Sequence, residues 1–125
     1  MSEPREPKKT IEPKNWAEFL EGFSARNNNR RARFNIFRGG EAQEEDQEAH
    51  LEDVKLVANG DAKNVEIIRI DRANSTADKI NDVITNVRGI AVQYDTDKSE
   101  DVLEITDDQN TLISLRMESK VDGAS

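Results

Sequence analysis

NWAEFLEGFSARNNNRRARFNIFR, residues 15–38, changes its hydrophobic period from that of a helix to that of a strand. The first part carries an apolar stripe at positions i, i+3, i+4 and i+7, made of Trp16, Phe19, Leu20 and Phe23. The second part alternates every two residues, with apolar side chains at Ala32, Phe34 and Ile36. The stretch therefore predicts a helix over Asn15 to Arg26, followed by a half-buried strand.

The rest of the chain is rich in short alternating segments. Five of them predict strands, over residues 51–57, 64–70, 89–95, 101–107 and 111–117, and their short links favour antiparallel pairing. Residues 41–50 are acidic without an apolar stripe, which indicates a long exposed loop. Residues 76–87 fit a helix and a short strand equally well, because Ile80, Val83, Ile84 and Val87 satisfy one period and Val83, Thr85 and Val87 the other.

These elements predict an α+β fold, with an N-terminal helix packed on a twisted antiparallel sheet of five or six strands. We expect a disordered charged tail over residues 1–12, a single domain over 13–118 and a disordered C-terminal tail over 119–125. The strand order stays open. The predicted core consists of Trp16, Phe19, Leu20, Phe23, Phe34, Ile36, Val54, Leu56, Ile68, Ile70, Val92, Leu103, Ile105, Ile113 and Leu115.

Composition excludes several classes of protein. The chain has 125 residues, a formal net charge of -8, no cysteine and a single histidine, so disulfides, thiolate chemistry and histidine-rich metal sites are not expected. The first residues, MSEPREPKKTIEPK, contain no apolar signal segment, and no later stretch is long and apolar enough to cross a membrane. We therefore expect a cytoplasmic protein that does not bind membranes.

The order of these parts resembles a bacterial domain-of-unknown-function family of small proteins. The matching residues are Trp16, Phe19, Leu20, Phe23 and Ser24 in NWAEFLEGFS, then Leu51 to Gly60, and VLEITDDQNTLISLRM near the C-terminus. Members often carry His and Pro where this chain has KINDVITNV, so a role for that histidine does not transfer. The resemblance implies a helix against an antiparallel sheet and no assigned activity.

Catalytic and metal-binding patterns are absent from the sequence. His50 stands among acidic residues without a motif that would make it a general base. DTDKSEDVLEIT, residues 95–106, begins like a calcium loop, but Glu100 stands where an EF-hand needs Gly and Thr106 where it needs Glu. We expect no enzyme activity, no catalytic residue, no metal and no cofactor.

Basic charge is concentrated in one place. Residues 26–38 carry +5, so the remainder of the chain carries -13. The candidate partner-binding residues are Arg26, Arg30, Arg31, Arg33, Phe37 and Arg38. Arginine forks suit phosphate and carboxylate alike. The acidic segment from Glu41 to Asp53 follows directly and could instead neutralise these arginines within the chain.

The favoured hypothesis is a non-enzymatic accessory or adaptor domain that binds another protein through this charged surface. Its partner and its oligomeric state stay open. The first alternative is a nucleic-acid or anionic-ligand binder that uses Arg26 to Arg38, which the acidic net charge and the scarcity of aromatics disfavour. The second is an enzyme or small-ligand domain whose site joins distant residues, for example His50 and Tyr94.

Overall fold

The computed structural model describes residues 8–38, 41–44, 49–71, 78–94 and 99–118. Within these ranges the chain forms a 3-10 turn, η1 (Pro13–Asn15), one helix, α1 (Trp16–Asn27), and nine strands. The strands are β1 (Lys8–Ile11), β2 (Arg31–Arg38), β3 (Glu41–Glu44), β4 (Ala49–Asn59), β5 (Ala62–Asp71), β6 (Asp78–Ile84), β7 (Val87–Tyr94), β8 (Glu100–Asp107) and β9 (Leu112–Met117). The predicted α+β class with an N-terminal helix is confirmed.

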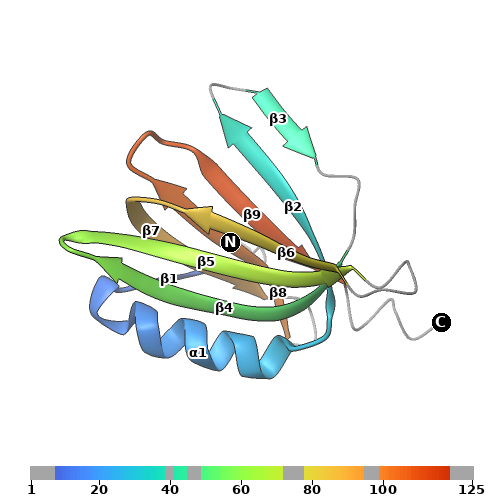
Figure 1. Ribbon diagram of the computed structural model, residues 1–125. Helices are drawn as coiled ribbons and strands as arrows, with labels where there is room; N and C mark the ends of the chain where they lie inside the picture. Colours follow the sequence, from blue (N-terminus) through green and yellow to red (C-terminus); the bar gives the residue numbers. More distant parts are fainter. Residues whose placement is uncertain (1–7, 39–40, 45–48, 72–77, 95–98, 119–125) are drawn as a thin grey trace, which may run out of the picture.

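The strands form one antiparallel sheet in the order β1-β7-β8-β9-β2-β4-β5-β6, and β3 pairs with the end of β2 (Figure 1). The prediction of five or six strands was too low. It missed β1, placed in the predicted disordered tail, and β3, placed in the predicted acidic loop. It also left residues 76–87 undecided, and their described part forms β6 and the start of β7.

Each of these three strands depends on its pairing with another strand, and for β1 that partner is distant in sequence. β1 pairs with β7, buries Ile11 and places Lys8 Nζ 2.8 Å from a carboxylate oxygen of Glu104. β3 pairs with the last four residues of β2, and β6 pairs with β5 along its whole length. The charged or mixed composition of each strand, taken alone, does not indicate that it pairs. Residues 1–7 and 119–125, the remaining parts of the predicted tails, lie outside the described residues.

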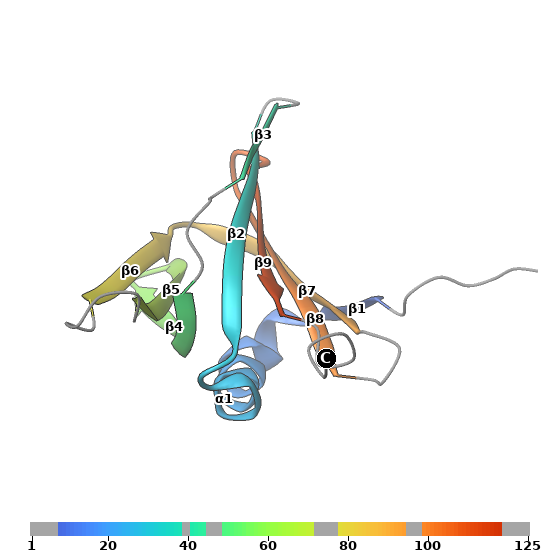
Figure 2. The same ribbon diagram turned by 90° about the vertical axis from the view of Figure 1, so that its right-hand side faces the viewer.

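The sheet is folded into two wings that diverge from β2. The first wing contains β4, β5 and β6, and the second contains β1, β7, β8, β9 and β2. β2 pairs with β9 from Ala32 to Phe37, but with β4 only at Arg31 and Ala32. Beyond that point the wings separate, and α1 lies between them at one end (Figure 2).

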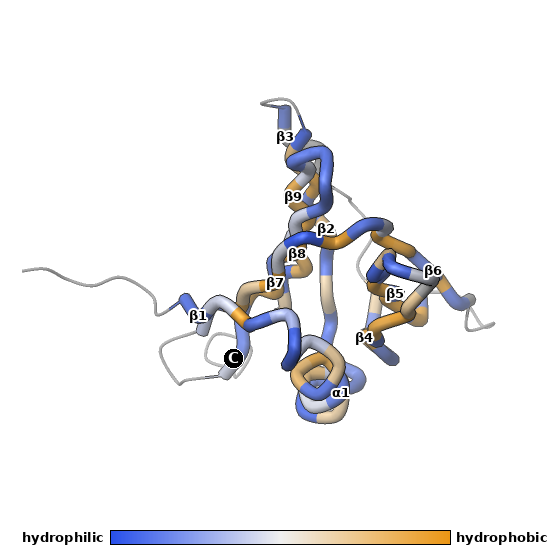
Figure 3. Tube along the Cα trace, turned by 90° about the vertical axis from the view of Figure 1, so that its left-hand side faces the viewer, coloured by the Kyte–Doolittle hydropathy of each residue, from blue (hydrophilic) through white to orange (hydrophobic). Residues whose placement is uncertain are grey.

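The hydrophobic core fills the space between the two wings and the helix. Hydrophobic and hydrophilic residues alternate along the strands, as half-buried strands require (Figure 3). The predicted core residues Trp16, Leu20, Phe23, Phe34, Val54, Val92, Leu103, Ile105, Ile113 and Leu115 are buried. Phe19, Ile36 and Leu56 are partly buried against them.

The predicted core was wrong in β5. Ile68 and Ile70 were expected inside, but the buried positions are Val65, Ile67 and Arg69. In NVEIIRI, both sets of alternating positions contain apolar residues. The set that faces the core is the one that includes Arg69.

Arg69 has an exposed fraction of 0%, and three groups surround its guanidinium. Its Cζ lies 4.3 Å from the centre of the Phe34 ring, on the opposite wing, which permits a cation–π contact. Its Nη1 donates to Ala32 O at 3.4 Å, and its Nη2 lies 3.5 Å from Asp82 Oδ2. These contacts allow a charged residue to occupy a core position.

The edge of β4 that leaves β2 finds its hydrogen-bond partners in the helix and the loop after it. Ser24 Oγ accepts from Val54 N and donates to Val54 O, both at 2.7 Å. Asn28 Nδ2 donates to Glu52 O at 2.9 Å. Leu51 exchanges backbone hydrogen bonds with the loop, accepting from Asn29 N at 2.6 Å and donating to Arg30 O at 2.8 Å. Because buried backbone groups need partners, this edge holds the end of α1 against β4.

Replacing the hydroxyl that bridges α1 and β4 tests this attachment. Ser24→Ala leaves the N–H and the C=O of Val54 without their partner, so we expect the free energy of unfolding in urea to fall by about 1–3 kcal/mol. Ala25→Ser, which adds a hydroxyl on the exposed side of the same helix, is the control and should change stability by less than about 0.5 kcal/mol. Equal effects of the two substitutions would contradict the role assigned to Ser24.

Candidate protein-interaction face

The fold separates the six predicted partner-binding residues into two groups. Arg26 belongs to the last turn of α1, and Arg30 to the loop that follows. The other four belong to β2. Arg31, Arg33 and Phe37 occupy alternate positions on the outer face, the face of the second wing turned away from α1 and the core. Arg38 occupies a position of β2 that alternates with these three and is therefore not on the outer face. Its Nε donates to Thr111 Oγ1 at 3.3 Å.

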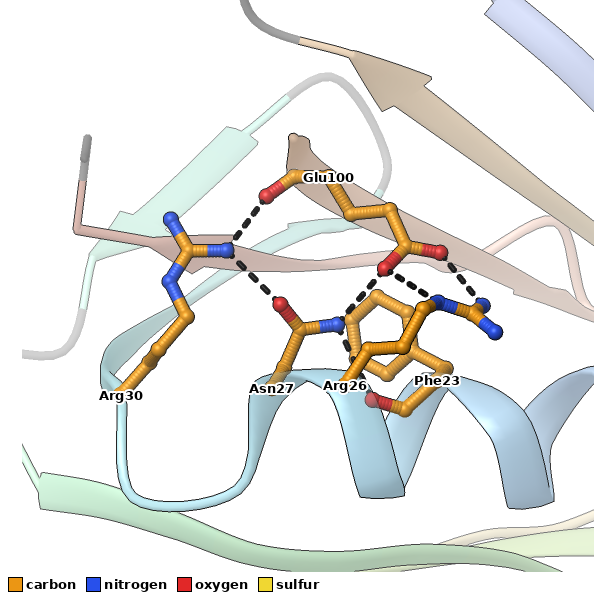
Figure 4. Close-up of polar contacts among 5 residues, drawn as sticks. All are labelled: Phe23, Arg26, Asn27, Arg30 and Glu100. Carbon is orange, nitrogen blue, oxygen red and sulfur yellow. Dashed lines mark hydrogen bonds and ion pairs between the residues drawn. The ribbon is translucent and has the colours of Figure 1, made fainter. Parts of the chain in front are cut away.

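Arg26 is held by the carboxylate of Glu100, the first residue of β8 (Figure 4). Its Nε donates to Oε1 at 3.0 Å and its Nη2 to Oε2 at 2.7 Å. Asn27 Nδ2 also donates to Oε1, at 2.8 Å, so the carboxylate, 7% exposed, accepts three hydrogen bonds. The bond to Glu100 raises the pKa of Arg26 above its ordinary value. A raised pKa stabilises the fold below the ordinary value, so this contribution persists until strongly alkaline pH.

Arg30 joins three segments that are distant in sequence. Its Nη1 donates to Asn27 Oδ1 and to Glu100 O, each at 2.8 Å, and its Nη2 donates to Glu118 O. The end of α1, the start of β8 and the residue after β9 are thereby tied together. Arg26 and Arg30 consequently have internal structural contacts, and the outer face is formed by other residues.

On the outer face, β2 and β9 place like residues opposite one another. Arg33 pairs with Arg116, Asn35 with Ser114 and Phe37 with Leu112. Along both strands, the outer face therefore changes from a basic pair through a polar pair to an apolar pair. Arg116 was missed by the sequence analysis. The alternation of TLISLRM places it outside, but only the strand order brings it beside Arg33.

The apolar end of this face lies on a projecting part of the molecule. β2, β3 and the start of β9 extend beyond the other strands at the end remote from α1 (Figure 1). Phe37 is 40% exposed there, and its neighbour Leu112 is half-buried. An exposed aromatic beside an aliphatic side chain is a common feature of protein interfaces.

The basic end of the face opens into a cavity of about 330 Å³. Its lining carries three arginines and two carboxylates: Arg31, Ala32, Arg33, Asp101, Arg116, Met117 and Glu118. Arg31 Nη1 lies 3.4 Å from Glu118 Oε1, and both side chains are about half exposed, so this ion pair is weak. Arg31, Arg33 and Asp101 make further polar contacts within the chain. By contrast, Arg116 is exposed, and its side chain makes no hydrogen bond or ion pair with any residue that the structure describes.

The acidic segment lies beside β2, as one interpretation of the sequence expected. Glu41 pairs with Arg38 and Glu44 with Asn35 in the backbone register of β2 and β3. This brings part of the acidic segment next to the apolar end of the face. Residues 45–48 of the same segment lie outside the described residues.

The distant residues proposed for a small-ligand site belong to strands that do not pair with one another. His50 is in β4 and Tyr94 in β7, and β2, β9 and β8 lie between these strands in the sheet. Among the described residues, no group of His, Cys, Asp and Glu could hold a metal ion. The start of the calcium-loop-like stretch, residues 95–98, lies outside the described residues. In the described part of the chain, no helix is long and apolar enough to span a membrane.

Comparisons with models of protein families, with curated proteins and with solved structures find no match for this chain. The resemblance of Trp16 to Ser24 and the later segments to a bacterial family therefore stays a prediction.

The Arg26–Glu100 contact can be tested through Gly22, because a Cβ at Gly22 would lie 2.7 Å from Arg26 Nη1. Ala should stabilise the helix by about 1 kcal/mol relative to Gly, but here its Cβ would force the Arg26 guanidinium, which Glu100 holds, to move. We expect Gly22→Ala to give the full stabilisation only when Arg26 is also replaced by Ala. Urea unfolding of the four variants of this double-mutant cycle measures the difference. An identical effect in both backgrounds would show that Arg26 does not restrict position 22.

The pairing of Arg33 with Arg116 should make the native outer face less stable than it could be. Like charges directly opposite on neighbouring strands destabilise a sheet, so Arg116→Thr should raise the free energy of unfolding by about 0.2–1 kcal/mol. Arg88→Thr is the matched control, since Arg88 is also an exposed arginine within a strand. A clear loss of stability in Arg116→Thr, measured by urea unfolding, would show that Arg116 has a structural role.

Proposed function

We propose that this protein is a non-enzymatic accessory or adaptor domain that binds an acidic partner protein on the outer face of β2 and β9. The binding face contains Arg31, Arg33, Phe37, Leu112 and Arg116. The observation that carries the proposal is the position of Arg116. It is exposed, it lies opposite Arg33, and its side chain makes no ion pair with a described residue.

The charge of the face selects the class of partner. Arginines form bidentate, charge-assisted hydrogen bonds with carboxylates, and a carboxylate placed between Arg33 and Arg116 relieves their mutual repulsion. The rest of the chain is strongly acidic, so its overall field discourages polyanions such as nucleic acids. A protein segment with a few local carboxylates can contact the arginines without approaching the acidic remainder.

Phe37 supplies the apolar contact that a protein partner needs. It lies on the same face as the arginines and beside Leu112. Charged contacts at a surface mainly direct association and orientation, whereas a desolvated aromatic contributes more of the affinity. The combination of arginines and an exposed aromatic supports protein binding more than binding of a simple anion.

Charge reversal at Arg116 tests the proposal. The immobilised wild-type protein, Arg116→Glu and Arg88→Glu are each incubated with nuclease-treated lysate at low ionic strength, and the proteins retained are quantified. We expect a protein retained by the wild type and by Arg88→Glu to be reduced about ten-fold or more with Arg116→Glu. Circular dichroism checks that all three proteins are folded.

Two results would count against this function. Retention of the same proteins in the same amounts by wild type and Arg116→Glu would show that the outer face is not the binding surface. Retention that occurs in a parallel sample of untreated lysate and is lost in the nuclease-treated lysate would instead favour the nucleic-acid alternative, for which the affinity should fall steeply with salt.

A further inference from the structure

We infer that the outer face recognises an extended peptide segment that carries an acidic side chain and an apolar side chain four residues apart. This inference rests on the proposed function and specifies what the partner presents. It is carried by the spacing of the residues on β2 and β9.

Two strands repeat the same spacing side by side. Arg33 and Phe37 are four residues apart on β2, and their neighbours Arg116 and Leu112 are four residues apart on β9. At about 3.3 Å per residue, the basic pair and the apolar pair are separated by roughly 13 Å along the strands. The face therefore presents two binding positions at a fixed distance.

An extended peptide laid along these strands has the same repeat. Its side chains at i, i+2 and i+4 point to one face, so an acid at i meets the arginine pair when an apolar residue at i+4 meets Phe37 and Leu112. A helix, which rises about 1.5 Å per residue, would need roughly nine residues to cover this distance. The extended form therefore satisfies both positions with the shortest segment.

The residues between the two positions favour a small polar side chain at i+2. Asn35 and Ser114 are opposite one another in the middle of the face, and Ser114 is buried. Both are shorter than the arginines and Phe37 on either side, so the middle of the face is lower than its ends. Serine or threonine at i+2 fits this position and can hydrogen-bond to Asn35.

The cavity beside the basic pair accommodates the acidic group. The cavity has a volume of about 330 Å³ and is lined by three arginines and two carboxylates. It therefore has room for a carboxylate, which would displace water from it. The weak Arg31–Glu118 pair at its edge is the contact that an incoming carboxylate would replace. An inorganic oxyanion could use the cavity but would gain nothing from Phe37.

Three peptides of matched length separate these possibilities in an NMR titration of the ¹⁵N-labelled protein. GSETSTLSG has the acid and the leucine four residues apart, GSETSLTSG has the same composition with a spacing of three, and GSQTSTLSG lacks the charge. We expect the first to bind about ten-fold more tightly than the other two. It should shift the amide signals of β2 and β9 around Arg33, Phe37 and Arg116.

Protein variants complete the test. Arg116→Glu and Phe37→Ser should each weaken binding of GSETSTLSG about ten-fold, and Arg88→Glu should leave it unchanged. Equal binding of the first two peptides, or shifts confined to other strands, would overturn the inferred spacing. Inorganic sulfate that shifts the same signals as strongly as GSETSTLSG, with no effect of Phe37→Ser, would reduce the site to an anion site.

The lysate experiment distinguishes a failure of this inference from a failure of the proposed function. If a retained protein depends on Arg116 but none of the peptides binds, the face binds a partner in another conformation and the inference is wrong. If retention is independent of Arg116, the proposed function is wrong.

Discussion

The hydrogen bonds between the end of α1 and the edge of β4 are the constraint on which the rest of the structure depends. Once β4 leaves β2 after two paired residues, its backbone groups face the interior and need partners. Ser24, Asn28 and the loop to Arg30 supply them. Because the helix occupies this edge, the sheet cannot continue flat across it, and the two wings diverge around α1.

This attachment also determines which arginines face outward. Fixing the end of α1 against β4 brings Asn27 and Arg26 to the start of β8, where Glu100 binds both. β2 then begins at once, with Arg31 and Arg33 on the face opposite the helix. The basic segment is thus divided: Arg26 and Arg30 bind Glu100 within the protein, whereas Arg31 and Arg33 belong to the outer face.

Much of this fold could be predicted from the sequence, because the patterns involved are local. The stripe of Trp16, Leu20 and Phe23 and the alternation of β2 identify elements that bury one side. β5 is different, since Ile67 and Ile68 are adjacent and both phases look plausible. Only the stacking of Arg69 on Phe34, from the other wing, shows which phase is inside.

The candidate site was partly accessible from the sequence for the same reason. Arg31, Arg33 and Phe37 follow from the alternation of one strand. Arg116 required the knowledge that β9 pairs with β2, although residues 39–111 separate the two strands in the sequence. Arg26 and Arg30 were candidates together with the arginines of β2, and the position of Glu100 shows that these two make internal contacts.

The pairing of β2 with β9 has a consequence for how the chain reaches this structure. During synthesis, β2 emerges long before β9. The edge of β2 that pairs with β9 therefore has no partner until the chain has been made as far as Met117. The hairpin of β4 and β5 can form earlier, since its contacts are local. Exposed strand edges favour aggregation, and arginines on β2 repel a second copy of the same strand. The charge proposed to attract a partner would therefore also protect the nascent protein.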